Sequence, residues 1–102
     1  MNLMASRTVK AKNPDGNEFD MALEIGPPYR MELNQWGCSV RVTNLFEPAR
    51  DIYGMDSWQA AQLAFRFISK ILRDFVSRGG TLYWKETMEP LTVNELFDST
   101  QP

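Results

Sequence analysis

Three carboxylates are the most obvious side chains in this sequence that could do chemistry. Glu47, Asp51 and Asp56 lie close together along the chain. Clustered carboxylates can hold a hard cation or act as an acid and base pair. Their spacing matches neither the calcium loop of an EF-hand nor any other known motif. We therefore expect Asp56 to cap a helix and Glu47 and Asp51 to be solvated.

Other catalytic residue types are scarce. The chain has no histidine, and Cys38 is its single cysteine. The absence of histidine removes the commonest general base and the usual zinc ligand. The single cysteine rules out an internal disulfide and a multi-cysteine metal site. Cys38 falls on the inward face of a predicted strand, so we expect an inert, buried thiol. We expect the chain not to be an enzyme, with no metal and no other cofactor.

A long helix is the clearest structural prediction, over residues 57–78. The Asp56-x-x-Gln59 pattern predicts its start, and Gly79-Gly80 predicts its end. At helical spacing, the apolar face comprises Ala61, Ala64, Ile68, Ile71, Leu72 and Phe75. Further apolar residues widen this face to roughly 220°, against about 100° for an ordinary surface helix. Those on one side are Trp58, Phe65 and Val76; those on the other are Ala60, Leu63 and Phe67.

Alternating polar and apolar residues predict strands before and after this helix in the sequence. The expected strands cover residues 7–12, 18–25, 36–44, 50–53 and 81–84, with the type of 29–35 left open. A last helical turn, capped by Thr92 with Glu95 at the box position, is expected over 92–97. The predicted fold class is α+β: an antiparallel sheet of three to five strands with the long helix packed on one face. The length predicts one domain, residues 1–102, with 98–102 as a loose tail.

The wide apolar arc of the helix predicts a protein interface. One sheet face cannot cover about 220°, so we expect residues 91–97 to cover one flank and 82–84 part of the other. Apolar surface left over would bind another protein, with a homodimer as the simplest case. The residues expected to take part are Trp58, Leu63, Phe65, Arg66, Phe67, Lys70 and Arg73.

Charge is unevenly distributed along the chain. Residues 57–78 carry four basic residues and one acidic residue, whereas 86–102 carry acidic residues and no base. The basic stripe is either a solvated helix face or a docking surface for an acidic partner, such as the acidic end of a second copy. No aromatic residue interleaves the stripe, and the net charge is −2, so we do not expect nucleic-acid binding. No signal peptide or membrane-spanning stretch is visible, so we expect a cytoplasmic protein and no membrane partner.

Residues 54–64 read Gly-Met-Asp-Ser-Trp-Gln-Ala-Ala-Gln-Leu-Ala, and residues 80–84 read Gly-Thr-Leu-Tyr-Trp. The two stretches resemble the Gly-x-Asp-Ser-x-Gln-Ala-x-x-Leu-Ala and Gly-x-Leu-x-Trp segments of a family of small uncharacterised bacterial proteins. Members of that family are about as long as this chain. The family has no agreed function, so the resemblance implies a domain of unknown function and supplies no catalytic residues.

Two other functional classes stay open from the sequence. Size, acidity and α+β character are also those of immunity proteins that inhibit bacterial toxins, a likeness of architecture alone. The chain could also be a small-ligand binder or an enzyme that uses its carboxylates and the aromatic residues Trp36, Trp58, Tyr83 and Trp84. Aromatic residues at core periodicity are usually core residues, however.

Overall fold

The first two strands of the computed structural model, which describes residues 2–97, form the predicted hairpin. β1 (Ala5–Lys12) pairs antiparallel with β2 (Glu18–Ile25) along its whole length. The turn between them is closed by Asn13, whose Oδ1 accepts hydrogen bonds from the backbone N–H groups of Asp15 and Asn17. The inward residues of both strands are buried, as their alternation predicts: Val9, Ala11, Met21, Leu23 and Ile25.

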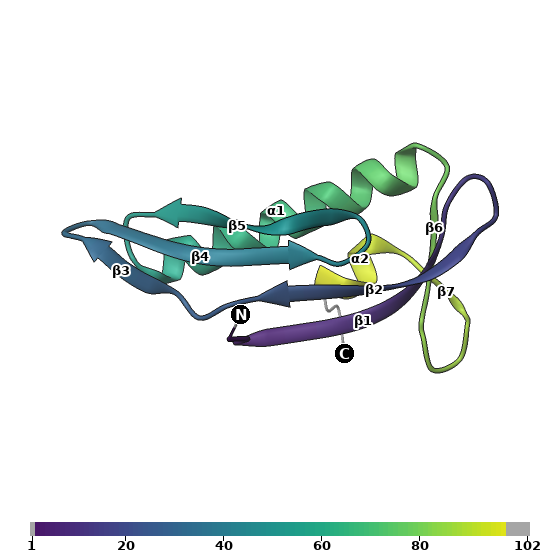
Figure 1. The fold of residues 1–102 in the computed structure, drawn as a ribbon, viewed down its shortest axis with the longest axis horizontal. Helices are drawn as coiled ribbons and strands as arrows, with labels where there is room; N and C mark the ends of the chain where they lie inside the picture. Colours follow the sequence, from purple (N-terminus) through teal and green to yellow (C-terminus); the bar gives the residue numbers. More distant parts are fainter. Residues whose placement is uncertain (1, 98–102) are drawn as a thin grey trace.

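β4 (Gln35–Val42) is the strand on which the rest of the sheet is assembled. β5 (Phe46–Gly54) pairs along one edge of β4. The other edge is shared by β2 and the short β3 (Tyr29–Glu32), which are separated by Gly26-Pro27-Pro28. The prolines therefore bend the chain, and pairing with β4 resumes beyond the bend (Figure 1).

β5 is longer than residues 50–53, the strand predicted there, because Pro48 does not interrupt it. The ladder between β4 and β5 shifts register between Val40 and Val42, opposite the segment that contains Pro48. A proline in such an irregularity, on the outermost strand of a sheet, removes no ladder hydrogen bond. The predicted start of this strand, at residue 50, is therefore wrong, because the strand begins at Phe46.

Helix α1 (Ser57–Ser77) begins as predicted and ends one residue before the predicted end, with Arg78 as its C-cap. Asp56 is the N-cap, and its Oδ1 accepts from the Gln59 N–H at 2.7 Å. Gln59 Oε1 in turn accepts from the Met55 N–H. At the other end, Gly79 has a φ of +102°. The N–H groups of Gly79 and Gly80 donate to the carbonyls of Val76 and Phe75, which is the Schellman arrangement.

α1 packs on one face of the sheet, chiefly over β4 and β5 (Figure 1). Its buried residues are Ala60, Ala64, Ile68, Leu72 and Phe75. They meet the inward residues of the strands, including Cys38 and Val40, in one core. The α+β class, the antiparallel sheet and the single long helix on it are thus confirmed.

The chain after α1 completes the sheet at its far side. β6 (Thr81–Tyr83) pairs with β1, and β7 (Pro90–Leu91) pairs with β6. α2 (Val93–Phe97) follows, and Thr92 and Glu95 form the predicted reciprocal cap. The sheet has seven strands instead of three to five, because β3 and β7 are short strands that alternation does not reveal. The predicted tail, 98–102, lies outside the described residues.

Candidate interaction site

One side of α1 carries the most exposed aromatic side chain of the described residues. Trp58 retains 79% of its accessible surface and Phe65 retains 39%. Residues seven apart in a helix lie on the same side, so both rings project from the same flank. Val76, further along this flank, is also exposed. The flank is apolar and uncovered at both of its ends.

The opposite flank of α1 is packed against the sheet. Phe67 meets Phe46 edge to face, with ring centroids 5.3 Å apart. The Arg50 guanidinium lies 5.4 Å from the centre of the Phe67 ring. Leu63, on the same flank, is half-buried. This side is therefore covered by β5, and the expectation that residues 91–97 and 82–84 cover opposite flanks is wrong.

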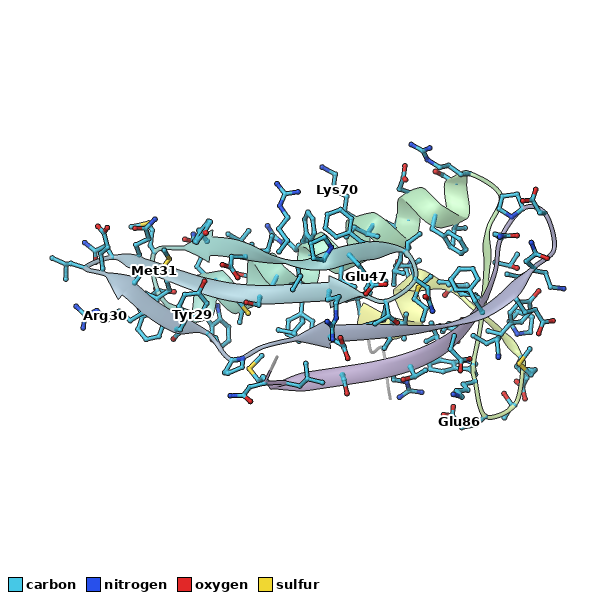
Figure 2. The ribbon with its side chains drawn as sticks, in the orientation of Figure 1. Tyr29, Arg30, Met31, Glu47, Lys70 and Glu86 are labelled. Carbon is cyan, nitrogen blue, oxygen red and sulfur yellow. The ribbon has the colours of Figure 1, made fainter. Side chains whose placement is uncertain are left out.

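The basic residues of α1 lie between the two flanks. Arg66 and Lys70 are exposed, and Figure 2 shows Lys70 projecting away from the body of the domain. Glu86 lies on the opposite side of the molecule in the same view. Lys70 and Glu86 therefore do not pair with each other within one chain.

A hollow of about 260 Å³ opens beside Phe65. Three elements supply its apolar lining: Leu23 and Ile25 from the sheet, Phe65 and Ile68 from α1, and Leu96 and Phe97 from α2. The hollow exists because α1 lies over β4 and β5, and the five-residue α2 covers only part of the remaining sheet face. Its volume falls below the roughly 300–1,000 Å³ of sites for small organic ligands.

Arg7 and Trp84 close the hollow at the β1 side. The Arg7 guanidinium carbon lies 4.7 Å from the centre of the Trp84 ring, within cation–π range. Both side chains line the hollow. The lining of the hollow thus carries two charged residues: Arg7, placed on an aromatic face, and Glu95 of α2.

The three carboxylates singled out above have separate local partners. Asp56 caps α1. Glu47 accepts from the Asn44 N–H at 2.9 Å, and Asp51 accepts from Ser39 Oγ at 2.6 Å. Within residues 2–97 they do not form a cluster with metal-ligand geometry.

Two further groups that could act as nucleophiles, the Cys38 thiol and the Tyr29 phenol, are held in their protonated forms. Burial raises the pKa of the Cys38 thiol, and its Sγ donates to the Gly26 carbonyl at 3.2 Å. Partial burial and the neighbouring Asp51 carboxylate raise the pKa of Tyr29 to about 12. Tyr29 lies over Gly37, where an added Cβ would come within 2.5 Å of the ring. At neutral pH neither group has the charge of a nucleophile or base.

The seven residues predicted for the interface do not share one surface. Trp58 and Phe65 lie on the open flank, Leu63 and Phe67 face β5, and Arg66 and Lys70 lie on the ridge between them. Arg73 is bonded to Asn94 of α2 at 2.7 Å. The sequence does not predict the hollow, because residues of its lining, such as Arg7, Ile25 and Trp84, come from separate strands and loops. The unusual width of the apolar arc was the only sequence signal for it.

The chain matches the family model described as a domain of unknown function (DUF6968) over residues 5–93. That range takes in all seven strands and α1. The chain belongs to the DUF6968 family. This match confirms the expectation that the chain contains a domain of unknown function. No curated protein and no solved structure matches this DUF6968 chain. In the described part of the chain, no helix is long and apolar enough to cross a membrane.

Proposed function

We propose that this DUF6968 domain is a non-enzymatic protein-interaction domain of the bacterial cytoplasm that associates with a second copy of itself. The observation that carries the proposal is the exposure of Trp58 and Phe65 on one flank of α1, next to an open apolar hollow. Large apolar surface that borders a hollow is typical of protein-binding sites. Tryptophan in particular is enriched among the residues that dominate binding energy.

The hollow suits a side chain better than a cofactor. It is small, and its lining is mostly apolar. Its two charged residues already have partners: Arg7 lies over the Trp84 ring, and Glu95 accepts hydrogen bonds from Thr92. An apolar side chain from a partner would fill it and remove water from Phe65, Ile25 and Leu96. Burial of one large apolar side chain contributes about 1.5–3 kcal/mol.

Charge favours a second copy as the partner. Among residues 2–97, Arg66 and Lys70 form no ion pair, and neither do Glu86 and Glu89. Figure 2 places Lys70 and Glu86 on opposite sides of the molecule. Two copies can therefore offer each other unpaired charges of opposite sign, which would orient their encounter. Added salt should then weaken the association somewhat.

The size of the protein in solution tests the proposal. Light scattering and sedimentation should give a dimer at micromolar concentration. Trp58→Ala and Phe65→Ala should each raise the dissociation constant about tenfold or more. Leu33→Ala is the matched control, because Leu33 is 76% exposed and lies in the turn between β3 and β4, away from the hollow. A monomeric wild-type protein, or equal effects of Trp58→Ala and Leu33→Ala, would count against the proposal.

The non-enzymatic part of the proposal rests on the chemistry of the available groups. The sequence has no histidine, and the pKa values of Cys38 and Tyr29 are raised. A broad screen for hydrolytic and redox turnover should find none that depends on the protein. Saturable turnover that Glu47→Gln or Asp51→Asn abolishes would overturn this part.

A further inference from the structure

β1 has one edge that is only partly paired. Along one side, all its residues from Ala5 to Lys12 pair with β2. Along the other side, β6 pairs only with residues 10–12. Within residues 2–97, the first five residues of β1 therefore have no strand on that side.

The backbone groups that face this open edge belong to Ser6 and Thr8. In β2, the Ala22 carbonyl accepts a hydrogen bond from the Thr43 N–H, and the Gly26 N–H donates to the Ser39 carbonyl. The backbone N–H and C=O groups of the even-numbered residues of β2 therefore point toward β4. Those of the odd-numbered residues then point toward β1. Given the register of the hairpin, the backbone N–H and C=O groups of Ala5, Arg7 and Val9 point toward β2. Those of Ser6 and Thr8 point outward, toward the open edge. Their N–H and C=O groups need a partner from outside the sheet.

This edge has little of the usual protection against strand pairing, because Arg7, the one charged residue of Ala5–Val9, is held over the Trp84 ring. Exposed edges are normally blocked by proline, charge, a bulge or very short length. β5 at the other side of the sheet has Pro48 and a register shift, and β7 has only two residues. Ser6 and Thr8 are small and uncharged. The hollow also opens beside this edge, because Ala5, Ser6 and Arg7 contribute to its lining.

We propose that β1 of a second copy pairs antiparallel with this edge, with the two-fold axis at Ser6, so that two sheets become one continuous sheet. The inference rests on the proposed self-association and names the contact that forms it. Antiparallel pairing of two identical strands has the two-fold symmetry of a closed dimer. Each copy would also bring its hollow and its Phe65 to the junction.

Charge selects the register. Centred on Ser6, the facing pairs are Ser6 with Ser6 and Ala5 with Arg7, so no like charges meet. Met4 is not counted among these pairs, because its N–H already donates to the Ile25 carbonyl of β2. Centred on Arg7, the two guanidinium groups would lie directly opposite each other, which is destabilising. Pairing ends before Lys10, because β6 occupies the edge from there.

Substitutions at Ser6 test the contact directly. Ser6→Pro removes the outward N–H without removing a hydrogen bond to β2, and it should raise the dissociation constant about tenfold or more. Ser6→Ala keeps the N–H and should dimerise like the wild type. Far-UV circular dichroism checks that both variants fold.

A cysteine at the axis gives a second readout. Facing residues of a hydrogen-bonded antiparallel pair have Cα atoms about 5.5 Å apart, within disulfide range. Ser6→Cys should therefore form a covalent dimer under mild oxidation, whereas Thr8→Cys, which lies two residues away from the axis, should not. The native Cys38 is buried in both variants.

The outcomes separate this inference from the proposed function. A dimer that survives Ser6→Pro, with no cross-link through Ser6→Cys, overturns the β1 contact and leaves self-association standing. A cross-link through Thr8→Cys in place of Ser6→Cys overturns the register. A wild-type protein that is monomeric overturns both self-association and the β1 contact. That outcome includes the case in which the β1 edge pairs with an extended segment of a different protein.

Discussion

Arg73 Nη2 donates to Asn94 Oδ1 at 2.7 Å, and this hydrogen bond joins the long helix to the short one. Arg73 Nε also donates to Ser69 Oγ at 3.2 Å. A residue that the sequence offers to an acidic partner is therefore used to hold α2 in place. Because Leu96 and Phe97 of α2 line the hollow, this bond helps to shape the hollow as well.

Removing the Asn94 side chain should loosen α2. Asn94→Ala deletes a hydrogen bond between exposed groups, so it should cost about 0.5–1.5 kcal/mol locally. Amide hydrogen exchange should become faster at residues 93–97 and stay unchanged in the middle of α1. Asn94→Asp is the control, because it keeps an acceptor beside Arg73. Unchanged exchange in Asn94→Ala would show that packing alone holds α2.

The parts of the fold that the sequence predicts are those set by neighbouring residues. The cap at Asp56, the stop at Gly79 and the turn at Asn13 all depend on bonds within a few residues. The hairpin of β1 and β2 follows from alternation and a turn of high propensity. Each of these elements is found with boundaries within two residues of the prediction.

The parts that the sequence does not predict depend on distant partners. β5 continues through Pro48 because, among residues 2–97, no strand pairs with its outer side. β3 exists because β4 extends beyond the end of β2. The hollow depends on where α1 lies across the sheet, and periodicity fixes only which face of a helix is apolar. For the same reason, the spacing of apolar residues in α1 does not show which flank of the helix α2 covers.

Asp56→Ala should destabilise the protein by about 1 kcal/mol, because the first turn of α1 loses its side-chain acceptor. Chemical denaturation measures this as a lower midpoint with an unchanged slope. Ser57→Ala, at the next position, is the control and should have a smaller effect. A midpoint for Asp56→Ala equal to that of the wild type would show that the cap contributes nothing.

Gly54→Ala should be more damaging than its small size suggests. An added Cβ would lie 2.5 Å from the Ala60 backbone nitrogen and 2.9 Å from its Cα. Backbone cannot rotate away, so α1 would have to shift against the sheet, at a cost of about 1–3 kcal/mol. Gly16→Asn is the comparison: nothing lies within 4 Å of its added Cβ, and asparagine tolerates the positive φ of 90°. Equal melting temperatures for the two variants would contradict the close packing of Gly54.

The ion pairs of Asp20 should make stability depend on pH. Lys10 Nζ and Lys85 Nζ lie 2.8 and 3.0 Å from its two carboxylate oxygens. The hydrogen bond from Lys10, and then the one from Lys85, lower the pKa of Asp20 below 3.8. The stabilisation is therefore present above pH 3.8 and is lost as the pH falls through the lowered value.

Asp20→Asn should accordingly be less stable than the wild type at neutral pH, and the difference should shrink in acid. Asp15→Asn is the control, because Asp15 forms no ion pair within the described residues. Thermal melts from pH 2.5 to 7 at low salt would measure both differences. A gap between Asp20→Asn and wild type that is constant over this range would contradict the assignment.

The three tryptophans occupy three different surroundings. Trp36 packs against the core from the inner face of β4, Trp58 is almost fully exposed, and Trp84 lies at the rim of the hollow under Arg7. Intrinsic fluorescence can therefore report on three events without any attached dye. The emission of Trp58 should shift to the blue when a partner covers its flank, and a Trp58→Phe variant identifies that component. Quenching by iodide should be strongest at Trp58 and weakest at Trp36. The emission of Trp36 should follow the integrity of the sheet, and that of Trp84 the filling of the hollow.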